Sequence, residues 1–193
     1  HIANNYPSVV FLLCMIIVTA SIKSAQFPFS SWLSRAMEGP TPSSAVFYGS
    51  LSVHLCVFLL MRTFSYWESI TFIKWLIISI GISTAIVASL IASVQSTVKT
   101  QIAYASIAQI GLMLIEVAMG WHYFALIHLS GNALLRTYQL LVSPSVLGYM
   151  IHNQFYNYVK KEFNNKVNLA TKVRNSIYVF CIQEWNLDNF LKN

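Results

Sequence analysis

Apolar segments long enough to cross a bilayer recur along this chain, and they limit the folds open to it. Roughly 20 residues of helix match a hydrocarbon core about 30 Å thick. The apolar segments are Ser8 to Ser24, Ser43 to Met61, Phe72 to Ser93, Gln101 to Met119, and Tyr123 to Leu147. Only 9% of the 193 residues are charged, whereas soluble proteins average about 25%. Because backbone groups in lipid must be satisfied within their own segment, we predict an all-α, polytopic membrane helix bundle with about five spans.

The stretch QFPFSSWLSRAMEGPTP, between the first two spans, contains several helix breakers. Pro28 removes a backbone donor, and Gly39, Pro40 and Pro42 interrupt the chain again. Non-helical backbone at membrane depth is tolerated only where it faces protein or a watery cavity. We therefore predict a broken helix at Pro28, followed by a short re-entrant or surface piece.

The residues after Gly148 form a basic, asparagine-rich tail. Its basic residues are Lys160, Lys161, Lys166, Lys172, Arg174 and Lys192. Cytoplasmic segments of membrane proteins carry an excess of Lys and Arg, so we expect a cytoplasmic tail. The sequence thus divides into a partial transmembrane core, residues 1–147, and a basic cytoplasmic or interfacial tail, residues 148–193. Within the tail, IYVFCIQEWNLDNFL predicts an amphipathic helix at the lipid interface.

The distribution of charge bears on sidedness and on partners. Five crossings place Arg35 and Lys99 on the side of the tail, and Arg62 and Lys74 on the other side. The net charge is +6, but no recognition module frames it, so we expect no nucleic-acid partner. The chain begins with His1 and lacks the features of a signal peptide, so we expect a piece of a longer protein.

The last span carries a polar stripe in an otherwise apolar helix. His128, Asn132 and Arg136 recur every four residues, and Gln139 and Ser143 extend the same face. An ionisable group near the bilayer centre costs a few kcal/mol, so its presence there points to a function. Such a stripe can line a hydrated path or pair with a neighbouring helix.

Three other spans also carry polar residues. The fourth has Lys99, Ser106, Gln109 and Glu116 within little more than a quarter-turn, the second has Ser43, Ser50 and His54 on one face, and the first has Lys23 beside the break. Groups that change charge, with hydrogen-bonding residues between them, are what a proton relay needs. Composition and spacing alone indicate a polytopic membrane protein with a buried polar axis.

Structural roles for these residues remain open at this stage. Lysines and glutamates near helix ends can snorkel to the interface, and buried histidines can be hydrogen-bonded packing residues. Arg136 stays charged at mid-span, so it can pair with Glu116 or with a helix-end carbonyl.

The sequence offers little for chemistry of other kinds. Cys14, Cys56 and Cys181 are far apart and are interpreted as packing residues. No nucleophile–base pair, metal cluster or phosphate loop is recognisable, so we expect no metal site, no cofactor and no catalysis by the chain alone.

Three motifs in order resemble a known family. KSAQFPFSSWLSRAMEGPTPSSA resembles the K-S-A-Q-x-P...A-M-E-G-P-T-P-x-S-A signature of the antiporter-like membrane subunits. VKTQIAYASIAQIGLM and FALIHLSGNALLRTYQLL are similar to the family's next two motifs. This family contains subunit L (chain 5) of respiratory complex I, the large subunit of Mrp sodium/proton antiporters, and the membrane subunits of bacterial inorganic-carbon accumulation systems.

The resemblance implies roles for individual residues. Lys23 matches the lysine of the broken helix, a proposed proton-binding centre, Lys99 the lysine that heads the next motif, and His128 the first relay histidine. Where the family has a second relay histidine and a relay lysine, this chain has Asn132 and Arg136.

Two further positions depart from the family pattern, and they change what the relay can do. Tyr48 replaces a histidine and Thr97 an aspartate, while His54, absent from the common pattern, is expected to take over a nearby role. Arginine effectively cannot give up its proton, and asparagine does not titrate. Arg136 is therefore expected to supply fixed charge, with His54 and Asn132 as intermediates.

The resemblance implies proton or cation translocation as the ion-conducting subunit of a larger complex, with other membrane subunits and lipid as partners. One alternative is a subunit L-like component of an NADH-quinone oxidoreductase. Another is the energy-coupling subunit of an inorganic-carbon uptake complex, which implies a cytoplasmic, zinc-binding, carbonic-anhydrase-like partner. A third is a non-conducting membrane scaffold. We expect the inner membrane of a bacterium as the location.

Overall fold

The computed structural model describes residues 6–156 and 169–183, which form helices joined by short connections, with no strand in these ranges. In chain order the elements are α1 (Tyr6–Lys23), α2 (Ser31–Ala36), α3 (Thr41–Ser44), the π-helix η2 (Ala45–Leu51), α4 (Leu55–Arg62), α5 (Phe64–Trp67), α6 (Thr71–Val94), α7 (Val98–Ala118), α8 (His122–Tyr156) and α9 (Leu169–Ile182). The predicted all-α class is confirmed.

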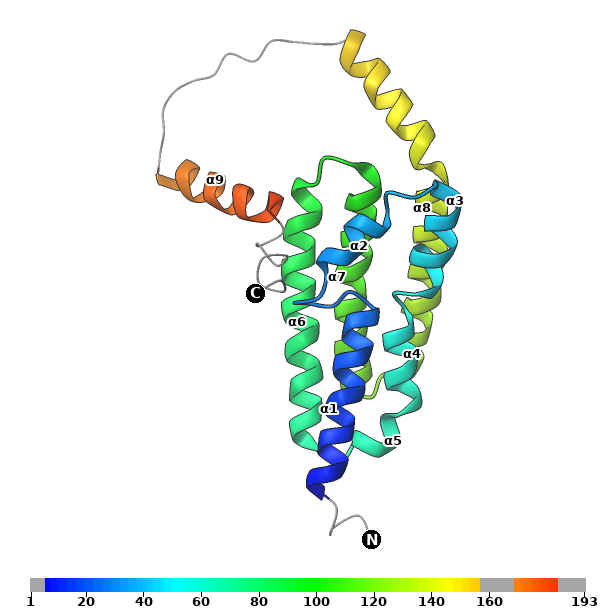
Figure 1. The fold of residues 1–193 in the computed structure, drawn as a ribbon, viewed down its shortest axis with the longest axis vertical. Coiled ribbons are helices and arrows are strands. Elements are labelled where there is room, and N and C mark those ends of the chain that lie inside the picture. Colours follow the sequence, from blue (N-terminus) through cyan, green and yellow to red (C-terminus); the bar gives the residue numbers. More distant parts are fainter. Residues whose placement is uncertain (1–5, 157–168, 184–193) are drawn as a thin grey trace.

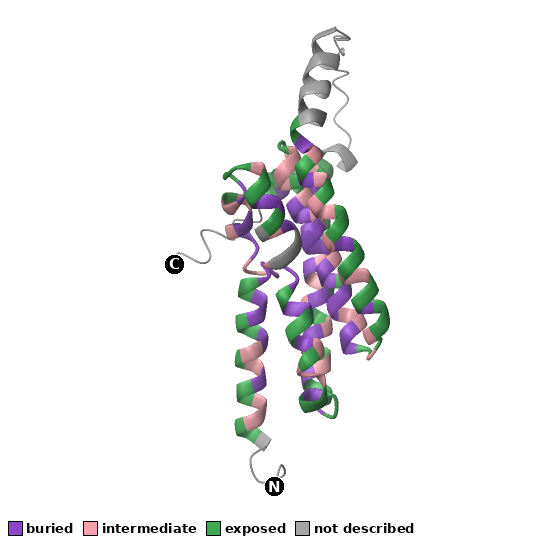
Figure 2. Ribbon diagram, turned by 90° about the vertical axis from the view of Figure 1, so that its right-hand side faces the viewer, coloured by how far each residue is buried: buried purple, intermediate pink, exposed green. Residues whose placement is uncertain are grey.

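The long helices α1, α6, α7 and α8 run roughly alongside one another, with α3, η2 and α4 forming a further pass (Figure 1). By length and composition α6 and α7 qualify as membrane spans, with mean hydropathies of 2.2 and 1.4, and α1 is a shorter apolar helix. Large apolar side chains such as Phe11, Trp75 and Ile127 are exposed on the outer faces, and the buried residues face inward (Figure 2). This is the pattern of a bundle surrounded by lipid, although the number of crossings stays a prediction.

Two glycines allow α6 and α7 to cross closely. A Cβ atom on Gly81 would come within 2.7 Å of the Gly111 carbonyl oxygen, and one on Gly111 within 2.7 Å of the Gly81 carbonyl oxygen. Small residues at helix crossings let backbones approach, and van der Waals contact then supplies much of the association in lipid. This crossing fixes the face of α7 that is turned toward α8.

A non-helical segment that contains Pro28 separates α1 from α2. Helix α1 ends at Lys23, Ala25 has a φ of 54°, and the Phe27–Pro28 peptide is cis. Polar contacts hold this non-helical segment: the Phe27 N–H donates to Thr84 Oγ1 of α6 at 3.1 Å, and the Gln26 side chain donates to the Ser24 carbonyl. The broken backbone therefore faces protein, as its depth in a membrane requires.

Gly39, Pro40 and Pro42 mark the next interruption, as predicted. Helix α2 ends at Ala36, and α3 begins at Thr41 after Pro40, whose ψ of 142° is extended. Pro42 lies in the first turn of α3, where its missing N–H costs no helical hydrogen bond.

The second span is not the single helix that was predicted. The π-helix η2 and a turn at residues 52–54 separate α3 from α4. The wider π turn alters the angular spacing of residues, so the predicted alignment of Ser43 with His54 is wrong. Ser43 is exposed and bonds to its own helix, whereas His54 is buried.

The two discontinuities meet. Ser24 Oγ, in the first break, accepts a hydrogen bond of 3.1 Å from the N–H of Cys56, in the first turn of α4. Both atoms belong to buried residues. A backbone donor that the interrupted helix leaves without a helical partner is thereby satisfied within the protein.

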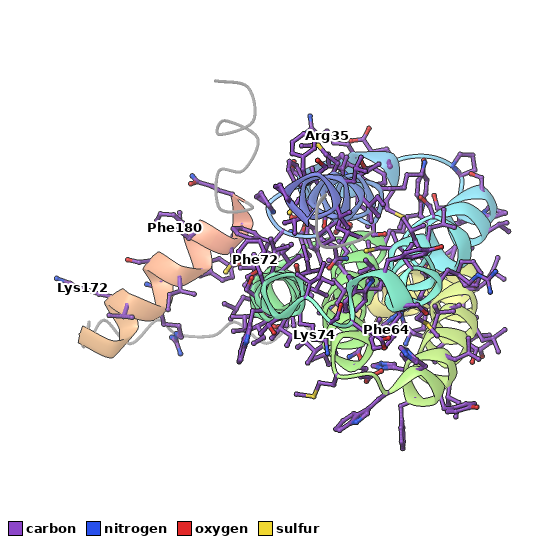
Figure 3. All side chains as sticks on the ribbon, turned by 90° about the horizontal axis from the view of Figure 1, so that it is seen from below. Arg35, Phe64, Phe72, Lys74, Lys172 and Phe180 are labelled. Carbon is purple, nitrogen blue, oxygen red and sulfur yellow. The ribbon has the colours of Figure 1, made fainter. Side chains whose placement is uncertain are left out.

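Helix α8 runs from His122 to Tyr156 through Pro144, past the predicted span end at Leu147 (Figure 1). Helix α9 lies at the edge of the bundle beside α6, with Lys172 at its end farthest from the bundle (Figure 3). The predicted tail helix began at Ile177, whereas α9 begins at Leu169, and residues 184–193 of that prediction lie outside the described residues. The α2 segment and the α6–α7 turn lie toward the same end as the end of α8, and α5 lies at the opposite end (Figure 1).

Substitution of the crossing glycines tests the α6–α7 packing. Gly111→Ala would force the two backbones apart, and we expect a loss of about 1–3 kcal/mol in the free energy of unfolding, as for other overpacked sites. The measurement is a denaturant titration in mild detergent, followed by circular dichroism.

Gly131→Ala is the matched control, because a Cβ there meets no atom within 4 Å. It should be neutral or slightly stabilising, since alanine favours helix. Equal stability of the two variants would contradict a backbone crossing at Gly111.

Candidate functional site

The polar residues of α7 and α8 face each other, and the start of α4 joins them from a third side. Ser106, Gln109 and Glu116 of α7 and His128 and Asn132 of α8 are buried or half-buried. The 3.6-residue period aligns each set on one helical face, as the sequence predicted. The break before α4 adds His54, which is 3% exposed.

His128 lies between two polar side chains of α7. Its Nδ1 is 2.9 Å from Glu116 Oε1, and its Nε2 is 3.0 Å from Gln109 Oε1. The second carboxylate oxygen of Glu116 is buried without a hydrogen-bond partner among the described residues. A carboxylate beside an imidazole can exchange a proton with it.

Asn132 joins three elements through one carboxamide. Its Nδ2 is 3.0 Å from His54 Nε2 and 3.4 Å from Ser106 Oγ, and its Oδ1 accepts from Arg136 Nε at 3.2 Å. Arg136 Nη1 also donates to Gln139 Oε1 at 2.7 Å. The group of His54, Ser106, Asn132, Arg136 and Gln139 therefore bridges the start of α4, α7 and α8.

Arg136 fixes the direction of the hydrogen bond to His54. A guanidinium only donates, so the Asn132 atom that faces it must be the carboxamide oxygen. The amide nitrogen then faces His54, and His54 Nε2 must accept, which places the proton of the neutral ring on Nδ1. Arg136 thus acts on His54 through Asn132 without exchanging a proton itself.

The pairing of Arg136 with Glu116, considered from the sequence, does not occur. Glu116 contacts His128, and Arg136 contacts Asn132 and Gln139. Arg136 instead borders a pocket of about 480 Å³ between α7 and α8, whose lining includes Gln101 and Ser143. The charge of Arg136 therefore faces a hollow where water can solvate it.

Lys99 lies at the start of α7, apart from these contacts. Its ammonium donates to the Gly39 carbonyl oxygen at 2.8 Å, which ties α7 to the segment between α2 and α3. Lys99 lines one pocket with Ser143 and a second with Glu38 and Arg35. Because Ser143 also lines the Arg136 pocket, these hollows follow one another from α8 to the end of the bundle.

Comparison with known proteins places the chain in a family. Residues 1–182 match the transmembrane family model described as NADH:quinone oxidoreductase/Mrp antiporter. The chain belongs to this antiporter family. It is 36% identical over 146 residues to the chloroplastic NAD(P)H-quinone oxidoreductase subunit 5 of Ranunculus macranthus, and 38% identical over 149 residues to that of Manihot esculenta. It is 34% identical over 151 residues to the NADH-ubiquinone oxidoreductase chain 5 of Lumbricus terrestris.

These alignments cover 75%, 76% and 78% of this chain, but only 20%, 20% and 25% of the respective relatives. The chain therefore spans at most a quarter of their length. Membership of the antiporter family, an all-α fold and an integral membrane location follow from the comparisons together with the apolar helices.

The structure shows the contacts of two residues, Thr97 and Tyr48, that differ from the antiporter-family motifs. Thr97, in place of an aspartate, still caps α7, because its Oγ1 accepts from the Thr100 N–H. Threonine and aspartate both serve at this position, so the cap survives while a charge is lost. Tyr48, in place of a histidine, packs its ring edge-on against Trp32, with 6.2 Å between the ring centroids.

Lys23 is the predicted site residue that these contacts do not reach. It is exposed at the end of α1 and lines a mostly apolar pocket with Cys56 and Leu59 of α4. Its neighbour Ser24 contacts the start of α4, so Lys23 lies near the His54 side of the bundle. Its role as a proton-binding centre stays a prediction.

Sequence reasoning missed the polar residues that support the breaks. Ser24 and Thr84 receive the hydrogen bonds described above, and both are buried. A polar side chain in an apolar segment is a usable signal, because buried polar groups nearly always have partners. Among residues 6–156 and 169–183, no group of three His, Cys, Asp or Glu side chains could hold a metal ion.

Replacement of Asn132 tests the three-element contact. Asn132→Leu would leave Ser106, His54 and the Arg136 Nε without this partner in a buried place, and we expect a loss of about 2–4 kcal/mol in the free energy of unfolding. Denaturant titration in detergent measures it.

Leu134→Ala, on the same helix and 75% exposed, is the control and should change stability little. If Asn132→Leu were no more destabilising than this control, the carboxamide would not be holding the three elements together.

Proposed function

We propose that this chain forms part of a proton-translocating path through the membrane. The observation that carries the proposal is a pair of hydrogen-bonded polar groups inside the bundle, Glu116 with His128 at the α7–α8 interface and His54 with Asn132 and Arg136 beside it. Titratable groups inside membrane helices are costly, and they characterise ion pathways and proton relays. The antiporter-family membership supports the same reading.

The proposed path has a charge-changing site at the α7–α8 interface, where His128 with Glu116 holds a proton. His54 and Asn132, one turn further along α8, are proposed as hydrogen-bonding intermediates. Gln109 and Ser106 lie one turn apart on α7 and supply the polar surface between these groups. Water would complete the connection, as in other membrane proton relays.

Lys99 is the proposed exit or entry group at the end of the bundle. The pockets that share Ser143 and Lys99 lead from Arg136 to the α2 segment. The fixed charge of Arg136 would keep the Asn132 carboxamide turned with its nitrogen toward His54. Lys23, the last residue of α1, is also proposed as a proton-binding site.

The longer protein is proposed to work within an NADH-quinone oxidoreductase rather than an inorganic-carbon complex. The relatives described above are all named as subunit 5 or chain 5 of such oxidoreductases. Other membrane subunits are then the expected partners, and the carbonic-anhydrase-like zinc partner loses support. Purification with flavin and iron–sulfur subunits would support the oxidoreductase, and purification with one zinc-binding protein would overturn it.

The membrane and the side of the tail also belong to the proposal. The α2 segment, the α6–α7 turn and the end of α8 lie toward one end, which agrees with the relative sidedness deduced from basic residues. We propose the cytoplasmic face of a bacterial inner membrane, and an organelle membrane is the alternative, since two relatives are chloroplastic.

Proton flux measured in vesicles tests the path. His128→Ala and Lys99→Ala should each lower flux about tenfold or more in the assembled complex, the lower end of what a positioned acid–base group contributes. The readout is the decay of an imposed pH gradient reported by a fluorescent dye.

Lys172→Ala, exposed on α9, is the control for loss of a basic residue and should leave flux unchanged. Wild-type flux in folded His128→Ala and Lys99→Ala variants would favour the scaffold alternative and end the proposal.

A further inference from the structure

The contact between His128 and Gln109 depends on the charge of the histidine. Gln109 presents its Oε1 to His128 Nε2 at 3.0 Å, and Glu116 presents Oε1 to Nδ1 at 2.9 Å. With acceptors at both ring nitrogens, His128 and Glu116 together must hold two protons. Either the ring is an imidazolium beside a carboxylate, or one proton has moved along the short bond to Glu116.

Loss of one proton from this pair changes which end of the Gln109 carboxamide can form a hydrogen bond with His128 Nε2. A neutral ring that keeps its proton on Nδ1, donated to an ionised Glu116, has a lone pair on Nε2. That lone pair would face the lone pairs of Gln109 Oε1, which is repulsive. Turning the carboxamide by half a revolution brings its NH₂ group to Nε2 and restores a hydrogen bond, because the two ends of an amide have nearly the same shape.

We infer that Gln109 is a positioning residue that latches the His128–Glu116 pair in its protonated or deprotonated state. While Gln109 Oε1 accepts the hydrogen bond from His128 Nε2–H, that proton cannot pass to water. When the side chain swings away, the N–H bond breaks, the proton passes to a water molecule, and Gln109 returns with its amide nitrogen forward. His128 is then neutral and still donates from Nδ1 to Glu116.

The surroundings allow such a movement. Gln109 is half-buried rather than enclosed, and the structure gives its side chain the contact with His128. The other titratable or charged groups near this part of α8 are Glu116 from α7, His54 from the start of α4, and His122 and Arg136 on α8 itself. Of these, Glu116 bonds directly to the His128 ring.

This inference rests on the proposed function for its biological role. Its test measures the protonation state of His128 and does not require proton flux. The latch predicts opposite effects for two substitutions of the same residue. Gln109→Glu supplies a carboxylate that, while ionised, only accepts, so it should hold His128 charged. Gln109→Leu removes the acceptor of Nε2–H, so the neutral ring with its proton on Nδ1 should gain population.

The experiment is nitrogen-15 NMR of histidine-labelled chain in lipid nanodiscs, across a pH series. The nitrogen shifts distinguish the imidazolium from each neutral tautomer, and His128→Asn assigns the signal. At a fixed pH we expect the ratio of charged to neutral His128 to rise about tenfold in Gln109→Glu and to fall about tenfold in Gln109→Leu, the effect of one charge-assisted hydrogen bond.

Gln95→Glu and Gln95→Leu, at the end of α6, are matched controls and should leave the His128 spectrum unchanged. Equal or same-direction shifts in the two Gln109 variants would overturn the latch, since a merely structural residue would perturb His128 similarly in both. Proton flux measured on wild-type chain in the assembled complex reports separately on the proposed function, so absent flux with opposite shifts would sink that proposal alone.

Discussion

The carboxamide of Asn132 is the interaction on which the polar interior depends. It is 6% exposed and meets His54, Ser106 and Arg136 at once, so three separate passes of the chain contribute to one set of hydrogen bonds. In a low-dielectric interior each of those groups would be costly to bury alone. The amide beside the buried His54 therefore uses both its donor and its acceptor.

The need of every buried polar group for a hydrogen-bond partner also explains how the broken helices are stabilised. An interrupted helix exposes backbone donors, and lipid offers them no partner. Here the first break supplies Ser24 to the N–H of Cys56 in the second, and α6 supplies Thr84 to the first. The two discontinuities stabilise each other, and the second delivers His54 to Asn132.

Much of the fold and of the polar interior could be predicted from the periodicity of the sequence and from its helix-breaking residues. The break at Pro28, the all-α class and the polar faces of α7 and α8 follow from rules of local spacing. The sequence could not predict that Ser43 and His54 lie on different faces, because a π turn is imposed by packing and leaves no clear local signal. The pairing of Glu116 with His128 rather than Arg136 depends on how two helices are offset along their axes, which intrahelical spacing does not encode.

By the motif resemblance Arg136 stands where the family has a relay lysine, and an arginine here has a physical consequence beyond loss of a titrating group. A lysine at this place could give its proton away and leave Asn132 free to turn, whereas a guanidinium always donates. The carboxamide is then held with its nitrogen toward His54, and the histidine is kept as an acceptor. Arg136 on α8 thereby sets the direction of these hydrogen bonds. Arg136 therefore orients its neighbours through the hydrogen bonds that it donates.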